Sequence, residues 1–172
     1  LECFTPAYIK AWDLQPVSTL ARETALFVNL GSVTRGLNRW LALKQLLDLL
    51  RDRVEVAERG VTIPEYPELT EFVNAPGYPL SDKGIAQYYE DHPSETIARA
   101  IRWGDDVNAR IADMVHNAGP FVGVRESMQA MEQAGIDQMT VSATPVHALE
   151  YEWNAHGLAQ FMKVIAGQEM GS

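Results

Sequence analysis

Residues 119–158 read GPFVGVRESMQAMEQAGIDQMTVSATPVHALEYEWNAHGL, and this stretch decides the fold class. After a Gly/Pro-marked entry, apolar residues recur at helical spacing from Val124 onward, and Gly135 offers the left-handed position that ends such a helix. A strand is predicted at 138–142, and Pro145 marks the first turn of a second helix. Helix, strand and helix at this spacing form one unit of an α/β fold with a parallel sheet.

The carboxyl end of the predicted strand carries Ser142, Ala143 and Thr144. In open parallel sheets, ligands bind at the carboxyl ends of the strands. A hydroxyl at this point, beside the free N–H groups of the next helix, can donate to a phosphoryl oxygen where the helix dipole favours negative charge. The same hydroxyl can instead cap the helix, and the two roles are compatible.

The pattern around this strand resembles the second motif region of the haloacid dehalogenase-like (HAD-like) hydrolases. It consists of PFVGVRESMQAMEQAG at 120–135, the serine that closes the strand, and the Thr-Pro pair that opens the helix. The continuation at 155–172, AHGLAQFMKVIAGQEMGS, is similar to the family's next strand and the loop after it, and the second strand is predicted at 161–166. The resemblance implies a Rossmann-like parallel-sheet core, partly represented by residues 1–16 and 119–172, with an inserted all-helical cap domain at 17–118.

The function that the resemblance implies is that of a Mg2+-dependent phosphatase, which acts on a small phosphate ester through an aspartyl-phosphate. Ser142 would bind a phosphoryl oxygen, and Ala143 and Thr144 would contact the substrate. The family's caps often present an arginine from the loop that corresponds to the start of the predicted helix 36–50. The candidates for choosing the substrate are therefore Arg35, Asn38 and Arg39. The alternative for these three residues is a solvated turn with surface ion pairs.

The catalytic motifs of the family are incomplete in the printed residues. No Asp-x-Asp pair occurs in the 172 residues, although the nucleophile of these enzymes is the first aspartate of such a pair. The lysine that neutralises the phosphate and the acidic pair that completes the Mg2+ site are not found either. These motifs are expected before residue 1 and after residue 172, and the 172 residues alone are predicted to be inactive.

Two other functions remain open at this point. One is a dehalogenase of the same superfamily, which needs the aspartate but not the metal. The other is a non-catalytic binding or interaction module, in which the helical region binds a protein or a small ligand and a degenerate HAD-like core supports it. An Asp-x-Asp pair after an apolar strand, upstream of Leu1, would favour an enzyme over the module.

The composition excludes several classes of protein. A net charge of −9 without any basic cluster makes nucleic acid an unexpected partner. No apolar run is long enough for a membrane span and no signal peptide is visible, so a soluble, cytoplasmic protein is expected. The single cysteine, Cys3, cannot form an intramolecular disulfide. Association, for example as a homo-oligomer, is expected because two readable strands leave sheet edges unpaired.

Metal and thiol chemistry receive no support from local motifs. His147 and Glu150 share a helix face, but the other histidines (His92, His116 and His156) supply no third ligand at suitable spacing, so no metal site is predicted. No signature of a cysteine protease surrounds Cys3. Upstream of the boundary at Gly119-Pro120, the pattern predicts only helices, which are expected at 1–16, 17–30, 36–50, 67–74, 81–92 and 94–118. Ser18, Ser81 and Ser94 are expected at helix starts, and the apolar helix faces are expected to include Phe27, Met114 and Val115.

Overall fold

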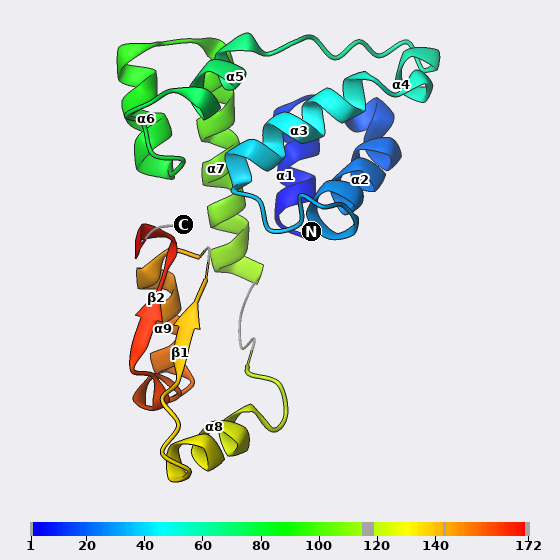
Figure 1. Ribbon diagram of the computed structural model, residues 1–172. Coiled ribbons are helices and arrows are strands. Elements are labelled where there is room, and N and C mark those ends of the chain that lie inside the picture. The colour runs from blue at the N-terminus through cyan, green and yellow to red at the C-terminus, as the bar shows by residue number, and fades with distance from the viewer. Residues whose placement is uncertain (1, 115–118, 143, 171–172) are drawn as a thin grey trace. The chain divides into compact units, whose positions relative to one another are not determined.

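The structure is a computed structural model that describes residues 2–114, 119–142 and 144–170. The chain divides into two compact units, residues 1–116 and 117–172, and each is described here by itself. The described part of the first unit is helical (Figure 1), with α1 (Phe4–Ala11), α2 (Ser18–Leu26), a π-helical turn (Phe27–Gly31), α3 (Arg39–Arg51), α4 (Val54–Glu58), α5 (Pro67–Asn74), α6 (Asp82–Asp91) and α7 (Glu95–Met114). The second unit contains α8 (Val124–Gln133), β1 (Met139–Val141), α9 (Val146–Ala155) and β2 (Val164–Ala166).

The first unit is built around α7, which packs against α1, α5 and α6. Its centre is aromatic: the buried rings of Trp40 and Trp103 meet edge to face with centroids 5.6 Å apart. Two predicted helix starts are confirmed, because the Ser81 hydroxyl accepts from Gly84 N–H at 3.1 Å and the Ser94 hydroxyl accepts from Ile97 N–H at 3.2 Å. Local capping chemistry therefore sets where α6 and α7 begin.

Several details of the helical unit differ from the prediction. Ser18 is the first residue of α2 and makes no capping hydrogen bond. Phe27, predicted on the buried face of a helix at 17–30, is 54% exposed, because the buried stripe of this segment runs through Ala21, Ala25 and Val28 and Phe27 lies to one side of it. A π-helical turn begins at Phe27. The third helix starts at Arg39 instead of Gly36, since Gly36 has a φ of 85° and cannot belong to a right-handed helix. The short α4 was not predicted.

The two ends of this unit differ from the prediction. Residues 1–16, assigned by the resemblance to the core, belong to the helical unit, where α1 packs against α2 and α7. The apolar stripe of the last predicted helix included Met114, which is 50% exposed, and Val115, which lies outside the described residues.

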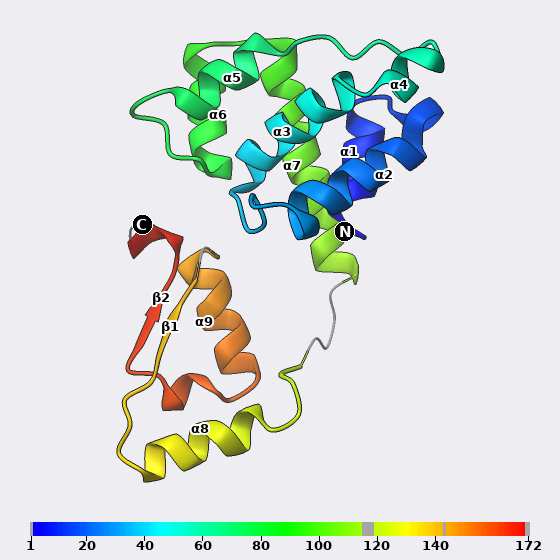
Figure 2. The ribbon, with the colours of Figure 1, turned by 45° about the vertical axis from the view of Figure 1, so that its right-hand side comes forward.

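The second unit is a small β-α-β arrangement. β1 and β2 pair in parallel, with Met139 opposite Val164 and Val141 opposite Ala166. α9 connects them and lies along one face of the pair (Figure 2). Both strands are shorter than predicted, and a 3-10 turn at Ala159–Phe161 replaces the start of the second one. The described chain is thus mostly helical, and its α/β character lies in this two-stranded parallel sheet.

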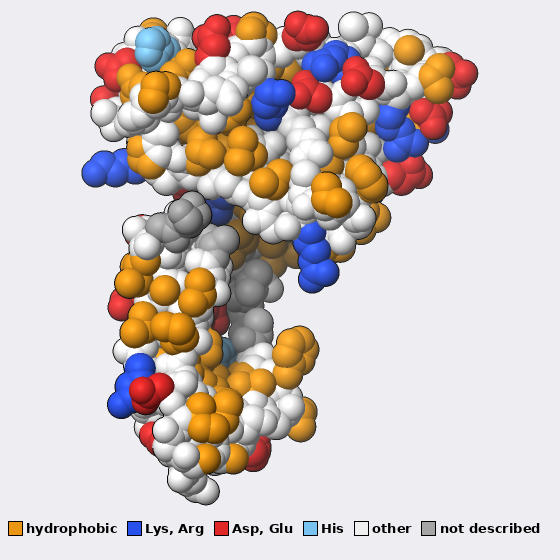
Figure 3. All heavy atoms as spheres, in the orientation of Figure 1, with side chains coloured by type: hydrophobic (Ala, Val, Ile, Leu, Met, Phe, Trp, Pro, Cys, Tyr) orange, Lys and Arg blue, Asp and Glu red, His pale blue; other side chains and the backbone are white. Residues whose placement is uncertain are grey.

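The core of the second unit is small. Met128, Leu158 and Phe161 are its buried hydrophobic side chains among the described residues. The sheet face opposite α9 exposes Met139 and Val141, at 63% and 77%, and Figure 3 shows hydrophobic side chains gathered over these strands. Parallel sheets are normally covered on both faces, so this face is apolar surface left without cover inside the unit.

None of the helices in the described residues combines the length and the apolar character that crossing a bilayer requires.

Candidate functional site

Ser142 lies directly after β1, as the sequence predicts for a strand-end serine. Its N–H donates to the carbonyl of Ala166 at 2.9 Å, so the backbone there still pairs with the end of β2. Its hydroxyl oxygen accepts from the N–H of Thr144 at 3.1 Å. Because the oxygen is the acceptor in this contact, the hydroxyl proton remains able to donate to a ligand. Ala143, the third residue predicted at this strand end, lies outside the described residues.

The two chain segments that leave the strands stay paired beyond the sheet. The N–H of Gln168 donates to the carbonyl of Thr144 at 3.0 Å. One step further, the N–H of Val146, the first residue of α9, donates to the carboxylate Oε2 of Glu169 at 2.9 Å. We call the three contacts Ser142–Ala166, Thr144–Gln168 and Val146–Glu169 the post-strand pairing. In the last of these contacts, the acceptor is the side-chain carboxylate of Glu169 instead of a backbone carbonyl.

Charged side chains from other elements hold both ends of α9. The Glu169 carboxylate lies at its amino end, and the Arg125 guanidinium donates to the carbonyls of His156 and Gly157 at its carboxyl end, at 3.3 Å for Gly157. An anion at the amino end and a cation at the carboxyl end both match the helix dipole. Since α9 has no fully buried residue, these polar contacts contribute much of what positions it.

The three predicted substrate-choosing residues of the first unit have different surroundings. The Asn38 side chain caps α3 by accepting from Trp40 N–H at 3.0 Å, and it donates to the carbonyl of Leu80 at 2.7 Å. Arg39 donates to Asn108 Oδ1 at 2.8 Å, pairs with Asp82 at 3.6 Å and lies over the Phe4 ring. The two side chains are therefore engaged in holding the helices together.

Arg35 differs from its two neighbours. It lies exposed in the turn before α3, and its guanidinium has no hydrogen bond or ion pair with the described residues. Apolar side chains surround it in the sequence, and those more than 40% exposed are Leu26, Phe27, Leu30, Val33 and Leu37. We call these five side chains the apolar segment. The structure therefore does not bring Arg35, Asn38 and Arg39 to a common point.

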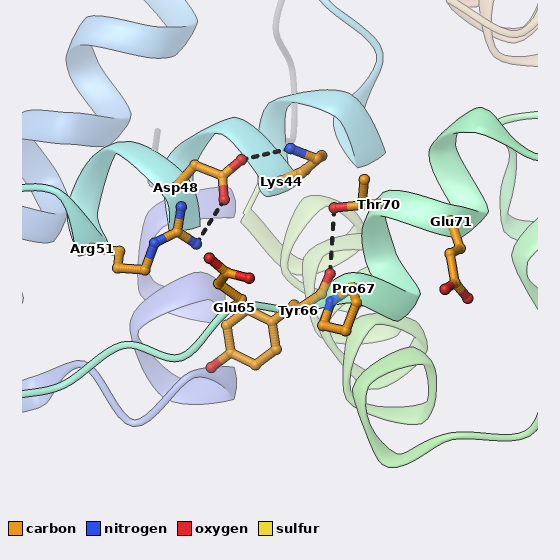
Figure 4. Close-up of a pocket in the computed structure, with 8 residues that line it drawn as sticks. All are labelled: Lys44, Asp48, Arg51, Glu65, Tyr66, Pro67, Thr70 and Glu71. Atoms are coloured by element: carbon orange, nitrogen blue, oxygen red, sulfur yellow. Dashed lines mark hydrogen bonds and ion pairs between the residues drawn. The ribbon is translucent and has the colours of Figure 1, made fainter.

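A pocket of about 410 Å³ lies between α3 and the start of α5 (Figure 4). Both cations that line the pocket are paired with Asp48. Its carboxylate lies 2.6 Å from the Lys44 ammonium and 2.9 Å from the Arg51 guanidinium. Two further carboxylates, Glu65 and Glu71, also line the pocket. The lining carries more acidic than basic groups, so it does not suit a phosphate ester.

The described residues do not fit the Mg2+ site that the resemblance implies. Across 2–114, 119–142 and 144–170, no group of three or more His, Cys, Asp or Glu side chains converges. Near the strand ends the carboxylate is Glu169, which is already bonded to Val146 N–H. Magnesium needs several oxygen ligands in octahedral geometry, so its protein ligands would have to come from other residues.

Sequence reasoning missed Glu169 and Arg125 as residues that shape this region. Both act over long sequence separations, on backbone groups 23 and 31 to 32 residues away. The local pattern gives no signal for Glu169, which follows the glycine after β2 in a short 3-10 turn, Gln168–Met170. The negative charge of Glu169 suits the amino end of α9, but every acidic side chain of this chain carries such a charge, so the charge does not single out Glu169.

Comparisons with protein-family models, with curated proteins and with solved structures find no match for this chain.

Proposed function

We propose that this chain supplies the phosphoryl-binding strand end of a HAD-like hydrolase, most simply a Mg2+-dependent phosphatase that acts on a small phosphate ester through an aspartyl-phosphate. The observation that carries the proposal is the position of Ser142, directly after the first of two parallel strands and before α9. Its hydroxyl proton is available to donate to a ligand oxygen.

In this proposal Ser142 donates to a phosphoryl oxygen, and Thr144 contributes at the same strand end. The helical unit acts as the cap that chooses the substrate, with Arg35 as its available cation. The nucleophilic aspartate, the lysine and the Mg2+ ligands are not among the described residues, so the proposal concerns a polypeptide that contains more than the printed residues. When bound, Mg2+ would neutralise the charge of the phosphoryl group.

The test uses the protein translated from the complete reading frame. We expect Mg2+-dependent hydrolysis of an aryl phosphate, and Ser142→Ala should lower kcat by roughly 100-fold, the usual effect of removing one donor to a developing charge. Ser142→Thr should retain most of the activity. Ser127→Ala, which changes an exposed serine of α8, is the matched control.

Three results would contradict the proposal. They are full activity of Ser142→Ala, turnover by the printed 172 residues alone, and a complete reading frame without an Asp-x-Asp pair after an apolar strand. Activity on a haloacid without Mg2+ would instead assign the dehalogenase reaction.

A non-catalytic interaction module is the second candidate, and the apolar segment favours it. Exposed apolar side chains gathered within one short segment often mark a protein-binding surface. In this candidate function, Val33→Asp should abolish self-association or partner binding, measured by light scattering during gel filtration. The same substitution should leave thermal stability unchanged, because the Val33 side chain is fully exposed. Phosphatase activity in the complete protein would exclude this candidate.

A further inference from the structure

The post-strand pairing raises the question of what holds Ser142 in place. Beyond β1, the backbone of Ser142 and Thr144 bonds to Ala166 and Gln168. These two contacts continue the parallel ladder past the residues that form the strands. The last N–H and C=O groups of such a ladder normally have no partner in the sheet and bond to water, so the end of the ladder frays.

The ladder does not end freely in this unit. The next N–H, that of Val146, bonds to the carboxylate of Glu169 at 2.9 Å. Gly167 lies between the two preceding contacts, buried, and a Cβ on it would be 2.5 Å from Val146 N and 2.8 Å from Thr144 O. The segment that contains Gly167 and Glu169 therefore packs closely against the backbone that joins Ser142 to α9.

We propose that Glu169 is the positioning residue of the phosphoryl-binding strand end. Its carboxylate closes the post-strand pairing at the first amide of α9 and thereby holds Ser142 and Thr144 in the geometry needed to meet a phosphoryl group. Glu169 does not touch the ligand in this arrangement and acts through Val146. The ligand part of this inference rests on the proposed function, while the positioning part depends only on the contacts described above.

A carboxylate is well suited to this task. It accepts a hydrogen bond from a helix-terminal N–H, where charge-assisted bonds are stronger than neutral ones. It also adds favourable charge at the amino end of α9, while Arg125 does the same at the other end. Helix α9 contributes no fully buried side chain, so the unit has little apolar packing that could replace these contacts.

The experiment compares Glu169→Ala, which removes the acceptor, with Glu169→Gln, which keeps an oxygen acceptor without the charge. Glu132→Ala, at an exposed carboxylate of α8, is the matched control. The readouts are amide hydrogen exchange of Val146, Ser142 and Thr144 by NMR in the 172-residue chain, followed by titration with inorganic phosphate. A global thermal scan of each variant separates local release from unfolding.

We expect Glu169→Ala to speed Val146 exchange about tenfold, the effect of one lost hydrogen bond, and to shift the Ser142 and Thr144 amides. The same variant should weaken phosphate binding several-fold, and Glu169→Gln should restore most of both properties. Glu132→Ala should behave as the wild type does.

The outcomes separate the two proposals. Unchanged exchange and amide shifts in Glu169→Ala would overturn the positioning role, whatever phosphate does. Tighter phosphate binding by Glu169→Ala would overturn it as well, because Glu169 would then be a competing anion. If exchange responds as expected but phosphate leaves Ser142 undisturbed in the wild type, the positioning role stands and phosphoryl binding by Ser142 is wrong.

Discussion

Gly167 lies so close to Val146 that a Cβ added to Gly167 would be 2.5 Å from the Val146 nitrogen and 2.7 Å from its Cα. Both neighbours are backbone atoms at the start of α9, which cannot move aside as a flexible side chain can. The contact explains how the segment after β2 reaches the carbonyl of Thr144 and the N–H of Val146. Only glycine permits this approach.

Gly167→Ala is therefore expected to destabilise the second unit by about 1–3 kcal/mol, the usual range for overpacking in a well-packed region. Urea denaturation followed by a probe in this unit, such as Trp153 fluorescence in a variant that lacks the other tryptophans, would measure the loss. Gly119→Ala is the matched control, because nothing lies within 4 Å of a Cβ at Gly119. Equal stability of the two variants would show that the close contact is not formed.

Asn38 is expected to stabilise the first unit whether or not it meets a substrate. Asn38→Ala should cost about 1–2 kcal/mol, because it removes both the α3 cap and the bond to the Leu80 carbonyl. Asn38→Asp keeps an oxygen for Trp40 N–H and should cost less. Denaturant unfolding checks both values.

The matched control for this loop is Arg35→Ala, since the exposed Arg35 side chain has no partner among the described residues. Its stability should stay within about 0.5 kcal/mol of the wild type. A large loss at Arg35, or none at Asn38→Ala, would contradict the assignment of structural roles in this loop.

Gly104 and Trp40 form a second close contact, inside the first unit. Glycine to alanine within a helix ordinarily stabilises by about 1 kcal/mol. At Gly104 the sign should reverse, because a Cβ would lie 2.9 Å from Cη2 of the buried Trp40 ring. We expect Gly104→Ala to lower stability by about 1–3 kcal/mol.

A double-mutant cycle tests the cause of that loss. Trp40→Phe shortens the ring that meets Gly104, so Gly104→Ala should cost much less in the Trp40→Phe background. Additive effects of the two substitutions would mean that the loss arises elsewhere in α7.

Tyr8 should make the first unit sensitive to alkaline pH. Burial raises the pKa of the Tyr8 phenol far above its ordinary value, with a smaller contribution from the charge of Tyr66. The folded protein thus keeps the phenol neutral where the unfolded chain ionises it. The corresponding stability is present below about pH 10, the pKa in the unfolded chain, and is lost as pH rises above that value.

Tyr8→Phe removes this dependence. Near neutral pH the variant should be as stable as the wild type or up to about 1 kcal/mol more stable, because the buried hydroxyl has no hydrogen-bond partner among the described residues. Above about pH 10 the difference in favour of the variant should grow. Unfolding by urea at a series of pH values measures it, and a constant difference across the series would show that the phenol ionises equally in both states.

Much of the secondary structure could be predicted from local chemistry. The bounds Pro67–Asn74 of α5 were predicted correctly, because a proline suits the first turn of a helix. The serine caps of α6 and α7 were predicted from the same kind of signal, and Gly135 has the left-handed φ of 71° expected after α8. These features depend on residues within a few positions of one another, so the sequence carries them directly.

The candidate site could be predicted only in part. Ser142 follows a strand as expected, but the partners that engage Asn38 and Arg39 lie 42 and 69 residues away, at Leu80 and Asn108. The π-helical turn at Phe27–Gly31 has no short sequence signature and was missed. The exposure of Phe27 was missed as well, because the helices that pack against α2 decide which of its faces is buried.

The sequence by itself determined most helices of the first unit, the order helix, strand, helix, strand in the second, and a hydroxyl at the end of the first strand. These properties follow from spacing, capping and turn chemistry, which act within one or two helical turns. Only the tertiary structure decided that Glu169 bonds to the first amide of α9 and that Arg125 bonds to the carbonyls at its other end. Such contacts join groups that are distant in sequence, and they form because the parallel pairing of β1 with β2 brings the chain after each strand to the same end of the sheet.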